Sequence, residues 1–167
     1  MNNRFYLRIL SVGVTVAMAL AMLAGCQQQP GAANAQKFES IRAMVLAGRY
    51  DAAITSLEKY ISKSADNKHA SRAGLFLFKS HFAKGDFEQA KKWCQWTIDN
   101  HPESLEARKC EFKLGLVLLA QEKDKAALKQ FKSVAASADN PLRPEATFFL
   151  KYMKQKLPAE SQGEKSQ

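Results

Sequence analysis

The sequence predicts an all-α domain built from repeated pairs of helices, and three features of the chain support this prediction. Apolar residues recur at helical spacing along most of its 167 residues. Alternating β-branched runs and hairpin turns, which would indicate strands, are scarce. Similar stretches also return every 37 residues, so that Ala53, Ala90 and Ala127 occupy equivalent positions. A repeat of this length predicts helix pairs that stack on one another.

Residues 1–25 have the features of a secretory signal peptide. Arg4 and Arg8 come before an apolar run that extends from Ile9 to Leu23, and small residues close the segment. This run is shorter than the roughly 20 residues that a membrane-spanning helix needs. We therefore expect cleavage after residue 25, with an uncleaved membrane anchor as the alternative.

The cysteine that follows this segment carries a second signal. The sequence LAGC, from Leu23 to Cys26, resembles the lipobox of bacterial lipoproteins. The resemblance implies that a lipid is attached to Cys26, and apart from this covalent lipid no cofactor is expected. Gln27 stands where an aspartate would favour the inner membrane. The resemblance therefore implies anchoring through the lipid at the periplasmic face of the outer membrane.

Two polar segments flank the predicted repeat domain at 37–157. Residues 26–36, which include QQQPGAANAQ, are small and polar and predict a flexible tether after the lipidated cysteine. Residues 158–167, PAESQGEKSQ, predict a disordered tail. The repeat domain is therefore expected to hold the whole folded core.

Three pairs of helices are expected within the repeat domain. The pairs are 35–47 with 51–64, 68–84 with 87–99, and 103–121 with 124–137. The equivalent alanines suit the points where paired helices cross, because a larger side chain would push the helices apart. Leu57, Cys94 and Phe131 are equivalent in the same way, which predicts that all three face inward.

A final helix is expected to cap the array. The sequence PLRPEATFFLKYMKQKL contains Pro144, which suits a first helical turn. Its large apolar side chains are expected to pack back onto the third helix pair, and they are Phe148, Phe149, Tyr152 and Met153. Such a helix would cover the apolar surface that the last repeat unit leaves open.

The three units resemble the tetratricopeptide repeat, in which Leu-Gly marks the first helix and an alanine followed by a large apolar residue marks the second. The matching residues are Ala53 and Leu57, then Leu77, Ala90 and Pro102, then Leu114, Gly115, Leu118, Ala127 and Phe131. The resemblance implies a short α-solenoid of three helix-turn-helix units plus a C-terminal capping helix. It also implies a protein–protein interaction scaffold, a non-catalytic accessory subunit of an envelope assembly or export machine.

The same resemblance implies a binding groove, because the first helices of such units line a concave surface that holds peptide segments. The matching positions are Phe38, Arg42, Val45, Arg72, Leu75, Lys79, Phe82, Lys109, Phe112, Leu116 and Leu119. Cations among apolar side chains suit a partner segment that carries carboxylates and apolar anchors. The expected partner is another envelope protein. The alternative is that a short array curves little and these side chains simply pack.

Cys94 and Cys110 are expected to lie side by side. They stand at equal distances on either side of Pro102, in helices expected to be antiparallel. In an oxidising compartment they form either a disulfide or a pair of buried free thiols. No CxxC motif accompanies them, so a catalytic thiol is not expected.

The charge and the motifs restrict the classes of function. The formal net charge is +9, which suits anionic lipid, acidic proteins or anionic polysaccharide. Nucleic acid would suit the charge but not a periplasmic location. His69, His81 and His101 lack metal-site spacing, and no phosphate-binding or hydrolase motif is present, so neither a metal nor an enzyme is expected. A binder of anionic cell-wall or exported polysaccharide is the alternative to the protein scaffold.

Overall fold

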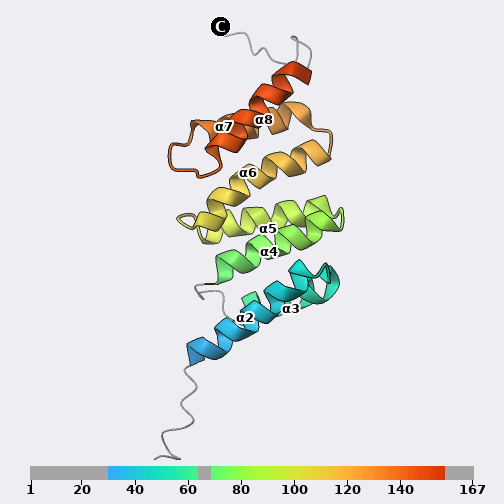
Figure 1. The fold of residues 1–167 in the computed structure, drawn as a ribbon, viewed down its shortest axis with the longest axis vertical. Coiled ribbons are helices and arrows are strands. Elements are labelled where there is room, and N and C mark those ends of the chain that lie inside the picture. The colour runs from blue at the N-terminus through green and yellow to red at the C-terminus, as the bar shows by residue number, and fades with distance from the viewer. Residues whose placement is uncertain (1–29, 64–68, 157–167) are drawn as a thin grey trace, which may run out of the picture. The chain divides into compact units, whose positions relative to one another are not determined.

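The structure is a computed structural model that describes residues 30–63 and 69–156. Within these ranges it contains seven α-helices and no strand, which confirms the all-α prediction (Figure 1). The helices are α2 (Pro30–Leu46), α3 (Tyr50–Lys63), α4 (Ala70–Ala83), α5 (Phe87–Asn100), α6 (Leu105–Ala120), α7 (Asp124–Ala136) and α8 (Arg143–Lys156). The chain divides into two units, Met1–Lys37 and Phe38–Gln167. The packing described below belongs to the second unit.

Consecutive helices pack against one another in this unit. α3 packs on α4, α4 on α5, α5 on α6, α6 on α7, and α7 on α8 (Figure 1). α4 and α6, the first helices of the second and third pairs, are also in direct contact. This succession of neighbours is the packing expected of stacked helix pairs.

The turns inside the three pairs share one geometry. Gly48, Gly85 and Glu122 all adopt positive φ angles, of 72°, 76° and 58°. In each turn the next residue donates its backbone N–H to a carbonyl five residues earlier, with N···O distances of 2.9, 2.9 and 2.8 Å. The residue with positive φ ends the helix in the left-handed conformation. The hydrogen bond that follows gives a partner to a helix carbonyl that would otherwise have none. Its recurrence supports the period found in the sequence.

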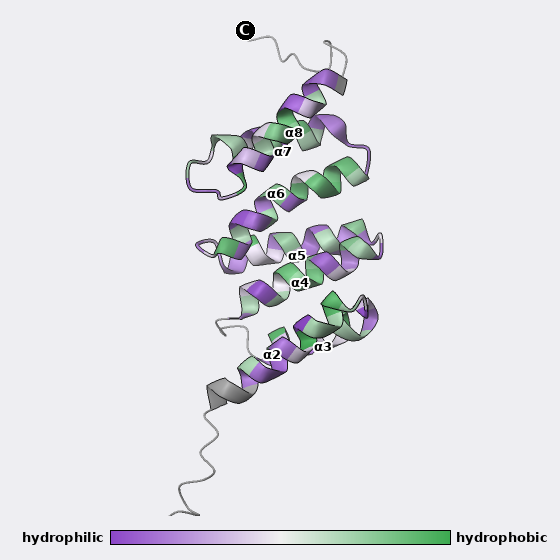
Figure 2. Cartoon of the chain, viewed as in Figure 1, coloured by the Kyte–Doolittle hydropathy of each residue, from purple (hydrophilic) through white to green (hydrophobic). Residues whose placement is uncertain are grey.

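Three buried clusters follow one another along the unit, and each draws on three helices. The first combines residues of α2, α3 and α4, the second of α4, α5 and α6, and the third of α6, α7 and α8. Each helix pair is therefore closed by the helix that follows it. Figure 2 shows hydrophobic and hydrophilic residues interspersed along the ribbons of these helices.

The residues that define the period lie where the sequence predicts. Ala53, Ala90 and Ala127 are completely buried at the helix crossings. The equivalent set Leu57, Cys94 and Phe131 is also completely buried. The predicted inward orientation is confirmed at all six positions.

Two predictions need correction at the ends of the domain. α2 begins at Pro30, so the expected tether is helical from that residue onward. Proline fits the first turn of a helix, and the alanines that follow have high helix propensity. The expected signal peptide and Cys26 lie outside the described residues.

The second correction concerns the capping helix. α8 buries Met153 and half-buries Phe149, but Phe148 is 67% exposed and Tyr152 is 51% exposed. Because each helical residue turns by about 100°, Phe148 and Tyr152 share a face that is rotated about 100° from the face of Phe149 and Met153. The helix caps the array with only half of its large apolar side chains.

Candidate functional site

The structure places several predicted groove residues in the core. Phe38, Leu75 and Phe112 are only 1%, 8% and 6% exposed. The ring of Phe38 packs against Tyr60 and Phe76, with centroids 5.6 and 5.8 Å apart. Val45 is buried as well. These side chains hold the helices together, so they do not line a surface that a partner can reach.

The other predicted groove residues remain accessible on α2, α4 and α6. Arg42, Arg72 and Lys79 are exposed, and Phe82, Lys109, Leu116 and Leu119 are half-buried. The two arginines already have counter-ions within the chain. Arg42 pairs with Glu39 at 2.6 Å, and Arg72 approaches Glu106 at 3.8 Å. The groove itself stays a prediction, and only its two lysines are cations without a carboxylate partner in the described residues.

A third cation, Lys113, joins these two lysines, although the sequence did not single it out. Lys113 lies on α6, and its Nζ is 5.4 Å from the centroid of the Phe78 ring on α4. The Nζ of Lys79, on α4, is 5.2 Å from the ring of Phe76. We call Lys79, Lys109 and Lys113 the lysine cluster. The signal that could have found Lys113 is its position one helical turn after Lys109.

Lys79 and Lys109 lie close enough to Lys113 to affect the pKa of its ammonium group. Lys113 is half-buried, and burial lowers the pKa of its ammonium group below the ordinary value. The positive charge of Lys79 lowers this pKa further, and Lys109 contributes in the same direction. The nearby Cys94 and Cys110 act in the opposite direction. A partly desolvated cation thus sits among like charges on the face where α4 meets α6.

The cysteine pair is part of the scaffold beneath this face. Cys94 on α5 and Cys110 on α6 are both free thiols and both completely buried. Cys110 lies close enough to Cys94 to affect the pKa of its thiol, in agreement with the expected neighbouring position. Burial, and then the contact with Cys110, raises the pKa of Cys94 far above that of a free thiol. A neutral, inaccessible thiol is a poor nucleophile.

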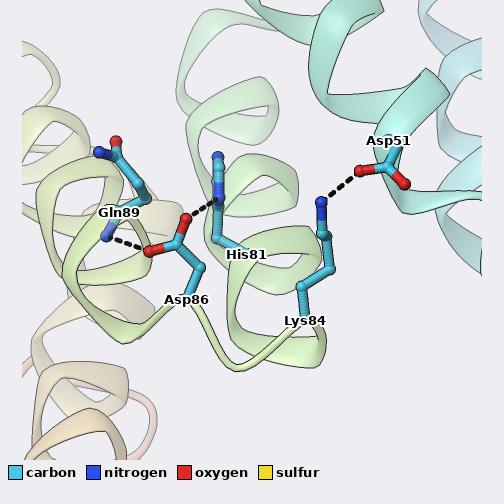
Figure 3. Close-up of polar contacts among 5 residues, drawn as sticks. All are labelled: Asp51, His81, Lys84, Asp86 and Gln89. Carbon is cyan, nitrogen blue, oxygen red and sulfur yellow. Dashed lines mark hydrogen bonds and ion pairs between the residues drawn. The ribbon is translucent and has the colours of Figure 1, made fainter.

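The turn between α4 and α5 holds a group of polar contacts with a structural purpose (Figure 3). Asp86 accepts a hydrogen bond from the backbone N–H of Gln89 at 3.3 Å and thereby caps α5. The other oxygen of Asp86 lies 3.3 Å from Nδ1 of the buried His81. Lys84 pairs with Asp51 at the start of α3, which links the first helix pair to the second. Nδ1 of His81 thus has a partner within the chain, whereas its buried Nε2 makes no hydrogen bond to the residues that the structure describes.

Two features of residues 30–63 and 69–156 restrict the kinds of site that this part of the chain can hold. No group of three or more histidine, cysteine, aspartate or glutamate side chains is arranged to hold a metal there. None of the helices described is both long and apolar enough to cross a membrane.

The comparison with protein families agrees with this architecture. The model of a family described as a tetratricopeptide repeat-like domain matches residues 2–145. The chain belongs to this family. No curated protein matched the sequence. Tetratricopeptide repeat-like domains generally mediate protein–protein interactions and are typically non-catalytic, so the fold is that of an interaction scaffold.

Proposed function

We propose that the protein is a periplasmic scaffold that binds another envelope protein through the face formed by α4 and α6. The observation that carries this proposal is the lysine cluster beside half-buried apolar side chains, on first helices of a tetratricopeptide repeat-like array. Accessible cations next to apolar surface suit recognition of a protein segment. The role is that of a non-catalytic accessory subunit in an envelope assembly or export machine.

The proposed location rests on the sequence. Cys26 follows the apolar run of the expected signal peptide and fits the position of lipid attachment. A lipid there would hold the scaffold at the periplasmic face of the outer membrane. Cys26→Ser should therefore release the full-length protein from membranes into the soluble fraction. Membrane association equal to that of the wild type would contradict the lipid anchor.

The partner is tested by crosslinking in the native envelope, followed by capture of the tagged full-length protein and mass spectrometry. We expect one dominant protein partner that is lost when Lys79→Glu and Lys109→Glu are combined. Lys125→Glu is the matched control, because Lys125 is an exposed lysine on α7, a second helix. Loss of the partner in both the double variant and the control would contradict recognition by α4 and α6.

A second function, binding of anionic cell-wall or exported polysaccharide, is favoured by the absence of counter-ions in the described surroundings of the lysine cluster. Polysaccharide carboxylates would supply the missing charge. Recovery of glycan without any protein, together with glycan binding that weakens steeply as salt is added, would select this function over the protein scaffold.

A further inference from the structure

The exposed side of α8 carries two aromatic side chains that do not pack into the core. Phe148 and Tyr152 are both more than half exposed, whereas Phe149 and Met153 pack into the third buried cluster. The ring of Phe148 meets that of Phe149 edge-on, with centroids 6.0 Å apart. Phe148 and Tyr152 are four residues apart, so they are neighbours on the helix surface. We call them the aromatic pair. Adjacent exposed rings, unlike a single one, indicate an interaction surface.

A row of cations runs beside the aromatic pair. Arg143, Lys151 and Lys154 are exposed, and at 100° per residue they fall within about 80° of one another around the helix axis. Lys151 is rotated by about 60° from Phe148, so the cations and the rings share the exposed side of α8. We call these three residues the cationic row. Glu145 is the one acid in the sequence of this helix, so α8 is strongly basic.

Two candidate partners fit this surface poorly. Residues 157–167 include one large apolar side chain, Leu157, so the end of the chain lacks the groups to cover two rings. A second copy of α8 would bring its own cationic row against this one. The aromatic pair exposes on the order of 250 Å² of ring surface, whereas each partner in a stable protein interface contributes roughly 800 Å². Most of a dimer interface would therefore consist of charged side chains, which are depleted in interface cores.

We propose that the exposed side of α8 binds the surface of an anionic phospholipid membrane. The aromatic pair enters the headgroup region, where tyrosine and other amphipathic rings are favoured. The cationic row lies against the lipid phosphates, and each cation adds electrostatic attraction to the anionic surface. Such binding needs rings beside cations and no deep groove, which is the arrangement on α8. Together with the proposed lipid on Cys26, this second contact restricts the directions in which the array can point.

This inference goes beyond the proposed function, because α8 lies outside the face formed by α4 and α6. The match to the family ends at residue 145, so the aromatic pair and two of the three cations lie beyond the matched residues. The inference shares with the proposed function only the location beside a membrane.

The test reconstitutes the full-length protein on vesicles and follows one position of α8. Gln155 is exposed and lies within about 20° of Phe148 around the helix axis, so Gln155→Cys carries a nitrobenzoxadiazole fluorophore on the exposed side. Cys94 and Cys110 are completely buried, and the unsubstituted protein, labelled in parallel, gives the background. The vesicles contain phosphatidylcholine with or without phosphatidylglycerol, and some lipids carry a nitroxide near the headgroup. We expect a blue shift and nitroxide quenching with phosphatidylglycerol, and neither with phosphatidylcholine alone.

Two substitutions in the Gln155→Cys protein test the rings and the cations separately. Phe148→Ser removes one ring and Lys151→Glu reverses one charge, and each should abolish most of the shift and the quenching. The matched controls are Leu105→Ser, which removes an exposed apolar side chain of α6, and Lys91→Glu, which reverses an exposed charge of α5. Both controls should keep the full signal. All four side chains are exposed, so each variant should melt close to the parent, which separates a lost contact from a lost fold.

Three outcomes would overturn the inference. They are equal emission on the two kinds of vesicle, an undiminished signal in both Phe148→Ser and Lys151→Glu, and a shift without phosphatidylglycerol that grows with the density of protein on the vesicle. The last outcome would assign the exposed side of α8 to a second copy of the chain. The proposed function fails independently of these results, because partner capture and release by Cys26→Ser are separate measurements, and the vesicle test starts from protein that is already reconstituted.

Discussion

The second and third repeat units reach the same fold with opposite distributions of side-chain size. In the second unit the first helix contributes the large Phe78 and the second helix contributes the small Cys94, within one buried cluster. In the third unit the equivalent positions are Gly115 and Phe131. A β-carbon at Gly115 would lie 2.5 Å from Cε1 of Phe131, so the ring fills the space that the glycine leaves. The large side chain of the pair therefore comes from the first helix in the second unit and from the second helix in the third.

This comparison explains why a cysteine occupies the position of a leucine or phenylalanine. Cys94 lies in one buried cluster with the large Phe78, where it behaves as a small hydrophobic residue. In the first unit the two equivalent side chains are similar in size: Ile41 of α2 and Leu57 of α3 lie in the same buried cluster. The turns differ between the units as well: Gly85 takes a positive φ without strain, whereas the third unit places Glu122 there.

The largest effect is expected from truncating the ring that fills the third unit. Phe131→Ala should lower the free energy of unfolding by about 3–5 kcal/mol, because it leaves a cavity. The ring also stacks on Phe149 of α8 at 5.0 Å between centroids, so the cap loosens too. Cys94→Ala, at the equivalent position of the second unit, should cost about 1 kcal/mol. Urea unfolding measures both variants. Equal losses of unfolding free energy would contradict the view that the large side chain lies on the second helix in the third unit only.

Oxidation of the cysteine pair should have the next largest effect. The small residue in the second unit brings Cys94 into contact with Cys110, and the third unit has no counterpart. Refolding in a glutathione redox buffer should form a disulfide between α5 and α6, as oxidised glutathione takes up the two electrons. A crosslink closing a loop of this length is worth about 3 kcal/mol.

The disulfide is detected by intact mass after alkylation in denaturant, and its stability effect by urea unfolding with and without reductant. Cys110→Ser is the control, since it cannot form the bond. The same unfolding midpoint in oxidised and reduced protein would show that the disulfide between α5 and α6 does not stabilise the fold.

A smaller loss is expected from adding one methyl group at the small position of the third unit. Gly115→Ala should destabilise the protein by about 1–3 kcal/mol, because the new β-carbon collides with the Phe131 ring. Combining it with Phe131→Leu should recover part of the loss, since the smaller side chain makes room. A double-mutant cycle measures this coupling. Strictly additive effects would mean that the two positions do not share one volume.

Much of this fold could be predicted because the signals are local or periodic. The turn at Gly85, the buried Ala90 and the inward Cys94 all follow from the 37-residue period. The site was harder to predict, since it depends on which side of a helix meets its neighbour. Phe38 was expected in a groove and lies in the core. Lys113 was missed because its burial and its neighbours arise only when α4 and α6 come together.

The smallest effect concerns the residue that starts the second helix of each unit. Asp86 caps α5 with its side chain, whereas Lys123, at the equivalent start of α7, makes no capping hydrogen bond. The backbones are alike, with φ and ψ of −84° and 74° at Asp86 and −90° and 60° at Lys123. Lys123→Asp should therefore add a cap and remove an unfavourable charge from the helix N-terminus, stabilising the protein by about 1 kcal/mol.

The control for this substitution is Lys123→Ala, which removes the charge without supplying an acceptor. Lys123 also donates a hydrogen bond to Gln121 at 3.0 Å, and both variants lose this exposed contact equally. The difference between their thermal midpoints therefore isolates the cap. If Lys123→Asp melts no higher than Lys123→Ala, a side-chain cap like that of Asp86 does not stabilise α7. The starts of α5 and α7 would then be equivalent in backbone conformation only.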